Sequence, residues 1–178
     1  MVVTYILVGA PTTANSSFAG SESKFMKVTA RSVMTSPVLS VQADTPLENV
    51  FALLLRHHIS GLPVVDKENL VVGVITEHDL LHLLFTPESP AKAVSELCCR
   101  DVLTVGEDQP LFEVADMLLT RGIRRVPVVD DEGHLVGIIS RRDLVRATRE
   151  FRQRIAIELE MRKEAKTNDR SDAETVGA

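Results

Sequence analysis

The sequence predicts a mixed α+β fold: two copies of a β-α-β-β-α unit pack against each other, and a long C-terminal helix follows them. Three observations predict it. The chain repeats itself at a shift of 64 residues. Each copy combines short apolar runs typical of strands with a helical 3–4 residue apolar spacing. An apolar stripe at helical spacing follows Asp143.

The internal repeat is the main evidence for this fold. Aligning 33–84 with 97–148 gives 20 identical residues in 52 pairs without a gap. The segment Pro63–Asp66 falls on Pro127–Asp130, and Gly73 falls on Gly137. The small sheet of one copy cannot bury both of its faces, so the two copies should pack together.

The elements of each copy follow in a fixed order. A β-prone run precedes a polar residue and a proline that start a helix. Two short strands joined by a turn come next, and a Thr or Ser then caps the last helix. In copy one these elements are Val38–Val41, a helix from Leu47 to about His57, Leu62–Val65, Leu70–Ile75 and a helix after Thr76. In copy two they are Val102–Val105, a helix from Leu111 to about Arg121, Val126–Val129, Leu135–Ile139 and a helix after Ser140.

The predicted domain organisation places both copies in the middle of the chain. The start is rich in Ala and Ser, with Met26 as a second potential start, and the end is polar, so we expect both to be disordered. The predicted divisions are 1–26 for the N-terminal extension, 27–90 and 91–148 for the repeats, 149–165 for the helix extension and 166–178 for the tail.

Composition excludes several functions. Aromatic residues make up 4% of the chain, with no Trp, which disfavours sites that stack sugars or single-stranded bases on exposed rings. The net charge of -5 excludes a chain-wide basic surface for nucleic acid or anionic lipid. No apolar run reaches the length of a membrane span. The two adjacent cysteines, Cys98 and Cys99, fit a reducing compartment, and we expect a cytoplasmic protein.

The repeated residues resemble a known family. Each copy carries a Pro-Val-Val-Asp strand and a Gly-x-x-Thr/Ser-x-x-Asp element, Gly73–Asp79 and Gly137–Asp143, and copy one opens with Thr35–Val38. This order is similar to a tandem pair of CBS domains, the cystathionine-β-synthase motif that forms a Bateman module, over about 31–148.

The resemblance implies pseudo-twofold symmetry and clefts that bind adenosine-containing ligands such as AMP, ADP, ATP or S-adenosylmethionine. It also implies a regulatory module, often a homodimer, that senses such a ligand and acts on a separate or attached protein. We therefore expect no enzyme activity and no catalytic cofactor. The sequence contains no nucleophile elbow and no Walker-type loop.

The pairs Thr76/Asp79 and Ser140/Asp143 have a chemistry that suits a nucleotide. Each hydroxyl lies at a helix N-terminus, where free N–H groups favour phosphate. The carboxylate three residues later could accept hydrogen bonds from a ribose diol. The alternative is a capping box, in which the same side chains only cap the helix.

The remaining predicted ligand-binding residues form an apolar slot for adenine and a basic group for phosphate. Arginines bind phosphate in a bidentate manner, so copy two should supply the better phosphate site. We group Arg124 and Arg125 with Ser140 and Asp143, although a twofold arrangement could mix residues from both copies. The full set is Thr35, Ser36, Pro37, Val38, Ile59, Gly61, Leu62, Pro63, Thr76, His78, Asp79, Val102, Ile123, Arg124, Arg125, Val126, Pro127, Ser140, Arg142 and Asp143.

Two other functions remain open. In the first, the clefts are vestigial and the long helix makes the chain an interaction or scaffold module. In the second, Arg142, Arg146 and Arg149 share a helix face that binds nucleic acid, although such faces are more often only solvated. His78 and His82 have the i, i+4 spacing of metal ligands, but no third ligand accompanies them, so we predict no metal site.

Overall fold

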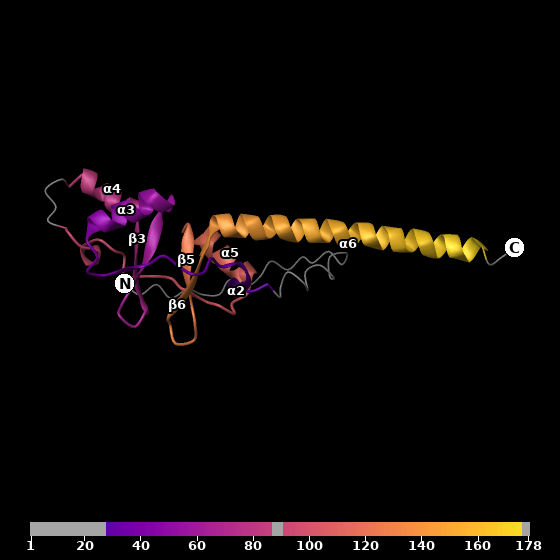
Figure 1. Ribbon diagram of the computed structural model, residues 1–178, viewed down its shortest axis with the longest axis horizontal. Coiled ribbons are helices and arrows are strands. Elements are labelled where there is room, and N and C mark those ends of the chain that lie inside the picture. Colours follow the sequence, from indigo (N-terminus) through magenta and orange to yellow (C-terminus); the bar gives the residue numbers. More distant parts are fainter. Residues whose placement is uncertain (1–27, 87–90, 176–178) are drawn as a thin grey trace.

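The computed structural model describes residues 28–86 and 91–175, with side chains to Met161, so the predicted extension 1–26 lies outside the described residues. The first part contains α2 (Ala30–Val33), β1 (Val41–Gln42), α3 (Leu47–His57), β2 (Gly61–Val65), β3 (Val71–Thr76), α4 (Glu77–Leu81) and a 3₁₀ turn (His82–Leu84). The second part contains a 3₁₀ turn (Val94–Glu96), β4 (Val105–Gly106), α5 (Leu111–Thr120), β5 (Arg125–Val129), β6 (Leu135–Ser140) and α6 (Arg141–Thr175) (Figure 1).

Each repeat forms its own three-stranded sheet. The strand orders are β1-β2-β3 and β4-β5-β6, with a parallel first pair and an antiparallel second pair. The registers correspond, since Val64 pairs with Gly73 in one sheet and Val128 with Gly137 in the other. The mixed α+β fold and the β-α-β-β-α order are confirmed. The first strand of each repeat has only two residues, shorter than the predicted runs.

Both helix starts at Thr76 and Ser140 are confirmed. Apart from the first strand of each repeat and the C-terminal end of α6, the strand and helix ends lie within one residue of the predicted ones. Strand β2 is buried along its whole length, as its unbroken apolar run predicts. Helix α3 is followed by His58, which has a left-handed φ of 51°, and Gly122 also has a left-handed φ at the matching position of repeat two.

The two repeats exchange their opening segments. Val94 belongs to the apolar core of repeat one, and its N–H donates to Thr45 O. In the same way, Ala30 belongs to the core of repeat two, and its N–H donates to Gln109 O. The predicted boundaries, 27–90 and 91–148, therefore cut across the packing, because the first residues of each copy complete the core of the other.

The exchanged opening segments also form β-bridges with the sheet of the other repeat. Thr35 forms a β-bridge with Ile138 of β6, and Cys99 forms the equivalent bridge with Val74 of β3. Each opening segment thus lies along the last strand of the other repeat. Any cleft at the end of β3 or β6 must contain residues from both copies.

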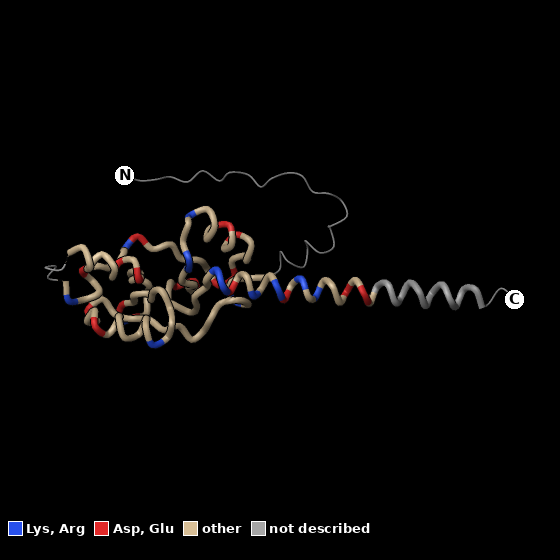
Figure 2. The backbone as a smooth tube through the Cα atoms, turned by 90° about the horizontal axis from the view of Figure 1, so that it is seen from above, with Lys and Arg blue, Asp and Glu red and all other residues tan. Residues whose placement is uncertain are grey.

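Helix α6 runs from Arg141 to Thr175 and projects from the paired repeats (Figure 1). We expected helix to 165 and a disordered tail over 166–178. The helix continues because the sequence has no Pro or Gly before Gly177 to stop it. Arginines and acidic residues alternate along the coloured part of α6 in Figure 2. Within the described residues, no helix is both long and apolar enough to cross a membrane.

The close packing of the opening segment on β6 gives a first prediction. A Cβ added at Gly137 would lie 2.7 Å from Cγ and 2.9 Å from Cβ of Met34. Gly137→Ala should therefore lower the free energy of unfolding by about 1–3 kcal/mol, measured by urea denaturation. Gly106→Ala is the control, because nothing lies within 4 Å of a Cβ there. Equal stability of the two variants would contradict this packing.

Candidate functional site

A cleft of about 580 Å³ lies where the end of β3 meets the opening segment of repeat two. This volume is in the range of small-molecule sites. We call it cleft A. Its lining comes from both repeats: Ser60, Val74, Thr76, Glu77, His78, Leu81, Cys99, Asp101, Val102, Leu103, Gly122, Ile123, Arg124, Arg125 and Pro127.

Thr76 and Asp79 form a capping box at the edge of cleft A. Asp79 Oδ2 accepts hydrogen bonds from Thr76 N at 2.8 Å and Thr76 Oγ1 at 2.6 Å. Within the described residues, Oδ1 of Asp79 has no hydrogen-bond partner. The capping alternative is thus present in the structure, and one carboxylate oxygen still remains available to a ligand.

Ser140 and Asp143 repeat this geometry with one difference. Asp143 Oδ2 accepts from Ser140 N at 2.8 Å and Ser140 Oγ at 2.5 Å. Its Oδ1, however, accepts a hydrogen bond from Arg146 Nη2, one turn along α6. The equivalent residue of repeat one is His82, so only the second carboxylate has both oxygens engaged.

Arg125 joins the two repeats. Its Nη1 donates to Gly61 O and its Nη2 to Ser60 Oγ, both at 2.6 Å. Burial lowers the pKa of Arg125 below its usual range, while the charges of Glu77 and Asp143 act in the opposite direction. Arg125 belongs to repeat two, and both of its acceptors belong to repeat one. It therefore lies at the boundary between the two repeats.

Our grouping of the arginines differs from the structure. Arg124 and Arg125 line cleft A together with Thr76 and His78, whereas Ser140 and Asp143 do not line it. Arg125 is at the same time the register partner of Ser140 across β5 and β6. The two arginines therefore lie beside residues of both copies.

The other predicted residues divide into three groups. His78, Val102, Ile123 and Pro127 line cleft A as well. Leu62, Pro63 and Val126 are fully buried, so packing accounts for them. The third group does not line cleft A: Thr35, Ser36, Pro37, Val38, Ile59, Gly61 and Arg142. Of these, Ser36, Pro37 and Val38 line a separate hollow of about 500 Å³ beside β6.

Eight lining residues were absent from our predicted set: Ser60, Val74, Glu77, Leu81, Cys99, Asp101, Leu103 and Gly122. The repeat itself carried a signal for some of them. Ser60 aligns with Arg124, and Leu103 continues the run that begins at Val102. Cys99 and Asp101 replace Thr35 and Pro37, so their residue types gave no indication of a ligand site.

A second hollow, of about 670 Å³, lies between β1 and α3 and is lined only by residues of repeat one. It contains neither of the repeated hydroxyl–carboxylate pairs, and Arg56 is its one charged lining residue. Size alone therefore does not mark the functional site, and cleft A has the better set of polar groups.

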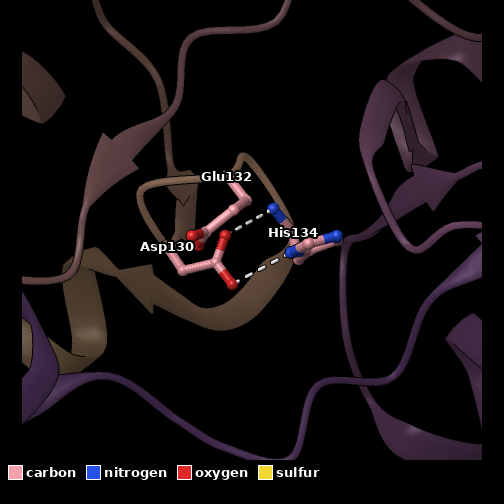
Figure 3. Close-up of side chains that lie close together, drawn as sticks. All are labelled: Asp130, Glu132 and His134. Carbon is pink, nitrogen blue, oxygen red and sulfur yellow. Dashed lines mark hydrogen bonds and ion pairs between the residues drawn. The ribbon is translucent and has the colours of Figure 1, made fainter.

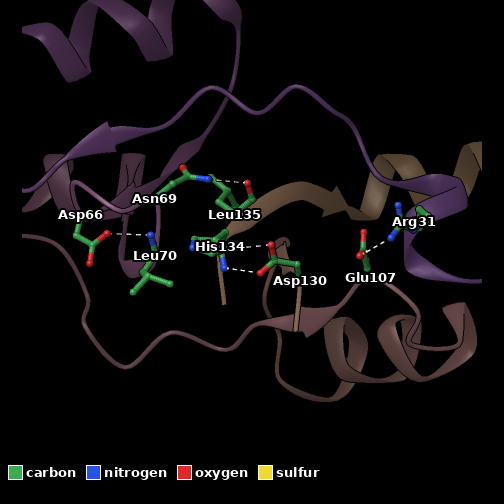
Figure 4. Close-up of polar contacts among 8 residues, drawn as sticks. All are labelled: Arg31, Asp66, Asn69, Leu70, Glu107, Asp130, His134 and Leu135. Atoms are coloured by element: carbon green, nitrogen blue, oxygen red, sulfur yellow. Dashed lines mark hydrogen bonds and ion pairs between the residues drawn. The ribbon is translucent and has the colours of Figure 1, made fainter. Parts of the chain in front are cut away.

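The β5–β6 turn brings together Asp130, Glu132 and His134, with ligand atoms within 4.8 Å of one another (Figure 3). Burial alone would raise the pKa of Asp130, but hydrogen bonds from His134 and Glu132 hold it below its usual value. Asp130 Oδ1 accepts from His134 N, as Asp66 Oδ1 accepts from Leu70 N in the other turn (Figure 4). Turn formation therefore accounts for this cluster.

The same two turns contact each other across the repeats. Asn69 Nδ2 donates to Leu135 O, and Leu135 N donates to Asn69 O (Figure 4). The ion pair between Arg31 and Glu107 attaches α2 to repeat two. These contacts fix the relative position of the repeats, and so the shape of cleft A.

The two adjacent cysteines have different surroundings. Cys98 packs against the core of repeat one, and burial raises the pKa of its thiol. Cys99 is exposed and lines cleft A. The rings of His78 and His82 meet edge to face, with centroids 4.9 Å apart.

Comparison with known proteins gives two matches to one family within this chain. The CBS domain family matches residues 30–86 and 94–150. Inosine-5'-monophosphate dehydrogenase of Methanocaldococcus jannaschii is 33% identical over 114 residues, which are 64% of this chain and 22% of the dehydrogenase. A 17.7 kDa protein of Acidianus ambivalens is 31% identical over 65% of this chain and 70% of its own length. The chain thus spans about a fifth of the dehydrogenase.

Two solved structures of CBS pairs were crystallised with adenosyl ligands. The CBS domain pair of MJ0100, in complex with 5-methylthioadenosine and S-adenosyl-L-methionine, has a TM-score of 0.62 and 30% identity over 68% of this chain and 95% of that one. CBSX2 in complex with AMP has a TM-score of 0.65 and 32% identity over 70% of this chain and 98% of that one. CBSX2 is a protein of Arabidopsis thaliana.

Proposed function

Because the chain belongs to the CBS-domain family, we propose that it is a regulatory module that binds an adenosine-containing ligand in cleft A. The ligand is AMP, ADP, ATP or S-adenosylmethionine, and a separate protein responds to the occupied state. The chain acts in this role without catalysing a reaction. The adenosyl ligands of the MJ0100 pair and of CBSX2 support the ligand class.

The observation that carries this proposal is the composition of cleft A. Asp79, which is hydrogen-bonded to the lining residue Thr76, keeps one oxygen without a partner in the described structure, and this oxygen could accept from a ribose diol. Val102, Ile123 and Pro127 offer an aliphatic surface to adenine, and Arg124 offers a guanidinium to phosphate. Cleft A has no aromatic lining residue besides His78, so aliphatic and backbone groups would hold the base.

Thermal unfolding with a panel of ligands tests the proposal. AMP, ADP, ATP, S-adenosylmethionine and NAD are added separately to the full chain. A ligand at 100 times its dissociation constant adds about 2.7 kcal/mol of stability, which for a domain of this size corresponds to a rise of about 5–10 °C in Tm. No rise with any of these ligands would contradict the proposal and favour a scaffold role.

Arg124 provides a prediction that separates nucleotide from nucleoside. Its side chain is exposed and lines cleft A, so its removal should not disturb the core. Arg124→Ala should weaken AMP binding about three- to tenfold and leave adenosine binding unchanged. Isothermal titration with both ligands measures this. An equal loss for both would show that Arg124 does not act on the phosphate.

We also propose that the module is a homodimer. Leu55 on α3 and Leu119 on α5 are 75% and 69% exposed and occupy equivalent positions of the repeat. Leu81 on α4 and Val145 on α6 form a second exposed equivalent pair. These apolar residues fit a symmetric interface with a second copy. Sedimentation equilibrium that gives the monomer mass at micromolar concentration would contradict it.

A scaffold function has one observation in its favour. Ile157, Leu159 and Met161 are more than half exposed on the projecting part of α6. The nucleic-acid alternative loses support at Arg146, which pairs with Asp143. A nucleic-acid affinity that falls steeply with salt would revive it. A cytoplasmic location stays a prediction.

A further inference from the structure

The two carboxylates of the repeated motif differ in one contact. Asp79 and Asp143 accept the same two hydrogen bonds through Oδ2, from the residue three positions earlier. Only Asp143 also accepts one through Oδ1, from the guanidinium of Arg146. The oxygen that would receive a ribose hydroxyl is therefore engaged in repeat two and has no partner within the described part of repeat one.

Burial strengthens this difference. Asp143 is 7% exposed and is the one charged residue in the buried core of the described chain. A buried carboxylate that loses its cation without a replacement is destabilised. To bind beside Asp143, two uncharged ribose hydroxyls would have to replace the guanidinium of Arg146. Ligand binding there therefore has a free-energy cost that is absent beside Asp79.

The residue types explain why only one repeat forms this pair. Position 146 corresponds to position 82, and His82 stands where repeat two has Arg146. The ring of His82 meets His78 edge to face. In repeat two, the guanidinium of Arg146 turns back to the start of α6 and reaches Asp143 three residues away.

We infer that Arg146 closes the ribose position of repeat two, so that this module binds its ligand in cleft A in preference to the equivalent site beside Asp143. Arg146 is thus a specificity-determining residue that sets how many ligands one chain holds. The inference rests on the proposed function, because it assumes that these carboxylates receive a ribose. It makes the two halves of a symmetric fold unequal through a single side chain.

The test uses adenosine, because a neutral ligand removes any attraction between Arg146 and phosphate. Asp79→Ala weakens binding in cleft A, so the site beside Asp143 contributes a larger share of the binding that titration of that variant measures. Adding Arg146→His gives repeat two the residue of repeat one and should tighten adenosine binding about three- to tenfold. Arg149→His in the same background is the matched control, one turn further along α6, and should change nothing.

The reciprocal variant completes the experiment. His82→Arg in the otherwise unchanged chain should weaken adenosine binding in cleft A by a similar factor. If Arg146→His leaves adenosine binding unchanged or weakens it in the Asp79→Ala background, the inference is overturned. Binding of adenosine by the wild-type chain would still support the proposed function. Absence of adenosine and AMP binding in the wild-type chain and in every variant would overturn the proposed function as well.

Discussion

Asp79→Ala should weaken AMP binding about 10- to 100-fold, which corresponds to about 1.4–2.7 kcal/mol. Asp79 is hydrogen-bonded to the lining residue Thr76 of cleft A, and its Oδ1 has no hydrogen-bond partner within the described residues. Hydrogen bonds from ribose to a charged carboxylate are among the stronger neutral–ion contacts, so their loss has a large effect. Isothermal titration with AMP measures the change.

Asp143→Ala is the matched control for this experiment. It removes the same capping contacts from the other repeat, together with the pair to Arg146, and neither of these hydrogen-bond partners, Ser140 or Arg146, lines cleft A. Each variant should lose about 1 kcal/mol of stability as its cap is lost. Ligand-free melting of both variants separates this loss from binding. Equal weakening of AMP binding by both would contradict the assignment of Asp79.

Arg125→Ala should lower the free energy of unfolding by about 2–3 kcal/mol. The substitution removes hydrogen bonds to Ser60 Oγ and Gly61 O, which are the part-buried acceptors that join the repeats. Acceptors left without a donor away from water are costly, and the aliphatic part of the side chain also loses its packing. Urea denaturation gives the change.

The neighbouring Arg124 supplies the control for Arg125. Its exposed side chain should contribute less than about 0.5 kcal/mol to stability. Arg125→Lys should restore only part of the stability, because one ammonium cannot copy the planar fork that reaches both acceptors. Wild-type stability in Arg125→Ala would show that this contact does not hold the repeats together.

The order of helices and strands within each repeat could be predicted from the sequence alone. The match of Pro63–Asp66 to Pro127–Asp130 and the caps at Thr76 and Ser140 are local features, and local rules of strand, turn and cap formation describe them. The fold class follows because one sheet of this size cannot be buried alone.

The arrangement between the repeats could not be predicted in the same way. Contacts such as Val94 N to Thr45 O depend on which copy receives each opening segment, and both choices give the same pattern of residues. The lining of cleft A by residues of both repeats, Thr76 and Arg124 among them, also depends on how the two copies pack. Likewise, the Arg146–Asp143 contact depends on a rotamer on α6, which composition and spacing do not determine.

A crystal structure of the full chain with AMP tests the central claim most directly. We predict ligand density in cleft A, with the ribose hydroxyls at Asp79 Oδ1 and the phosphate at Arg124. Density beside Asp143 with cleft A empty, or no density at either place in crystals grown at saturating AMP, would contradict the account.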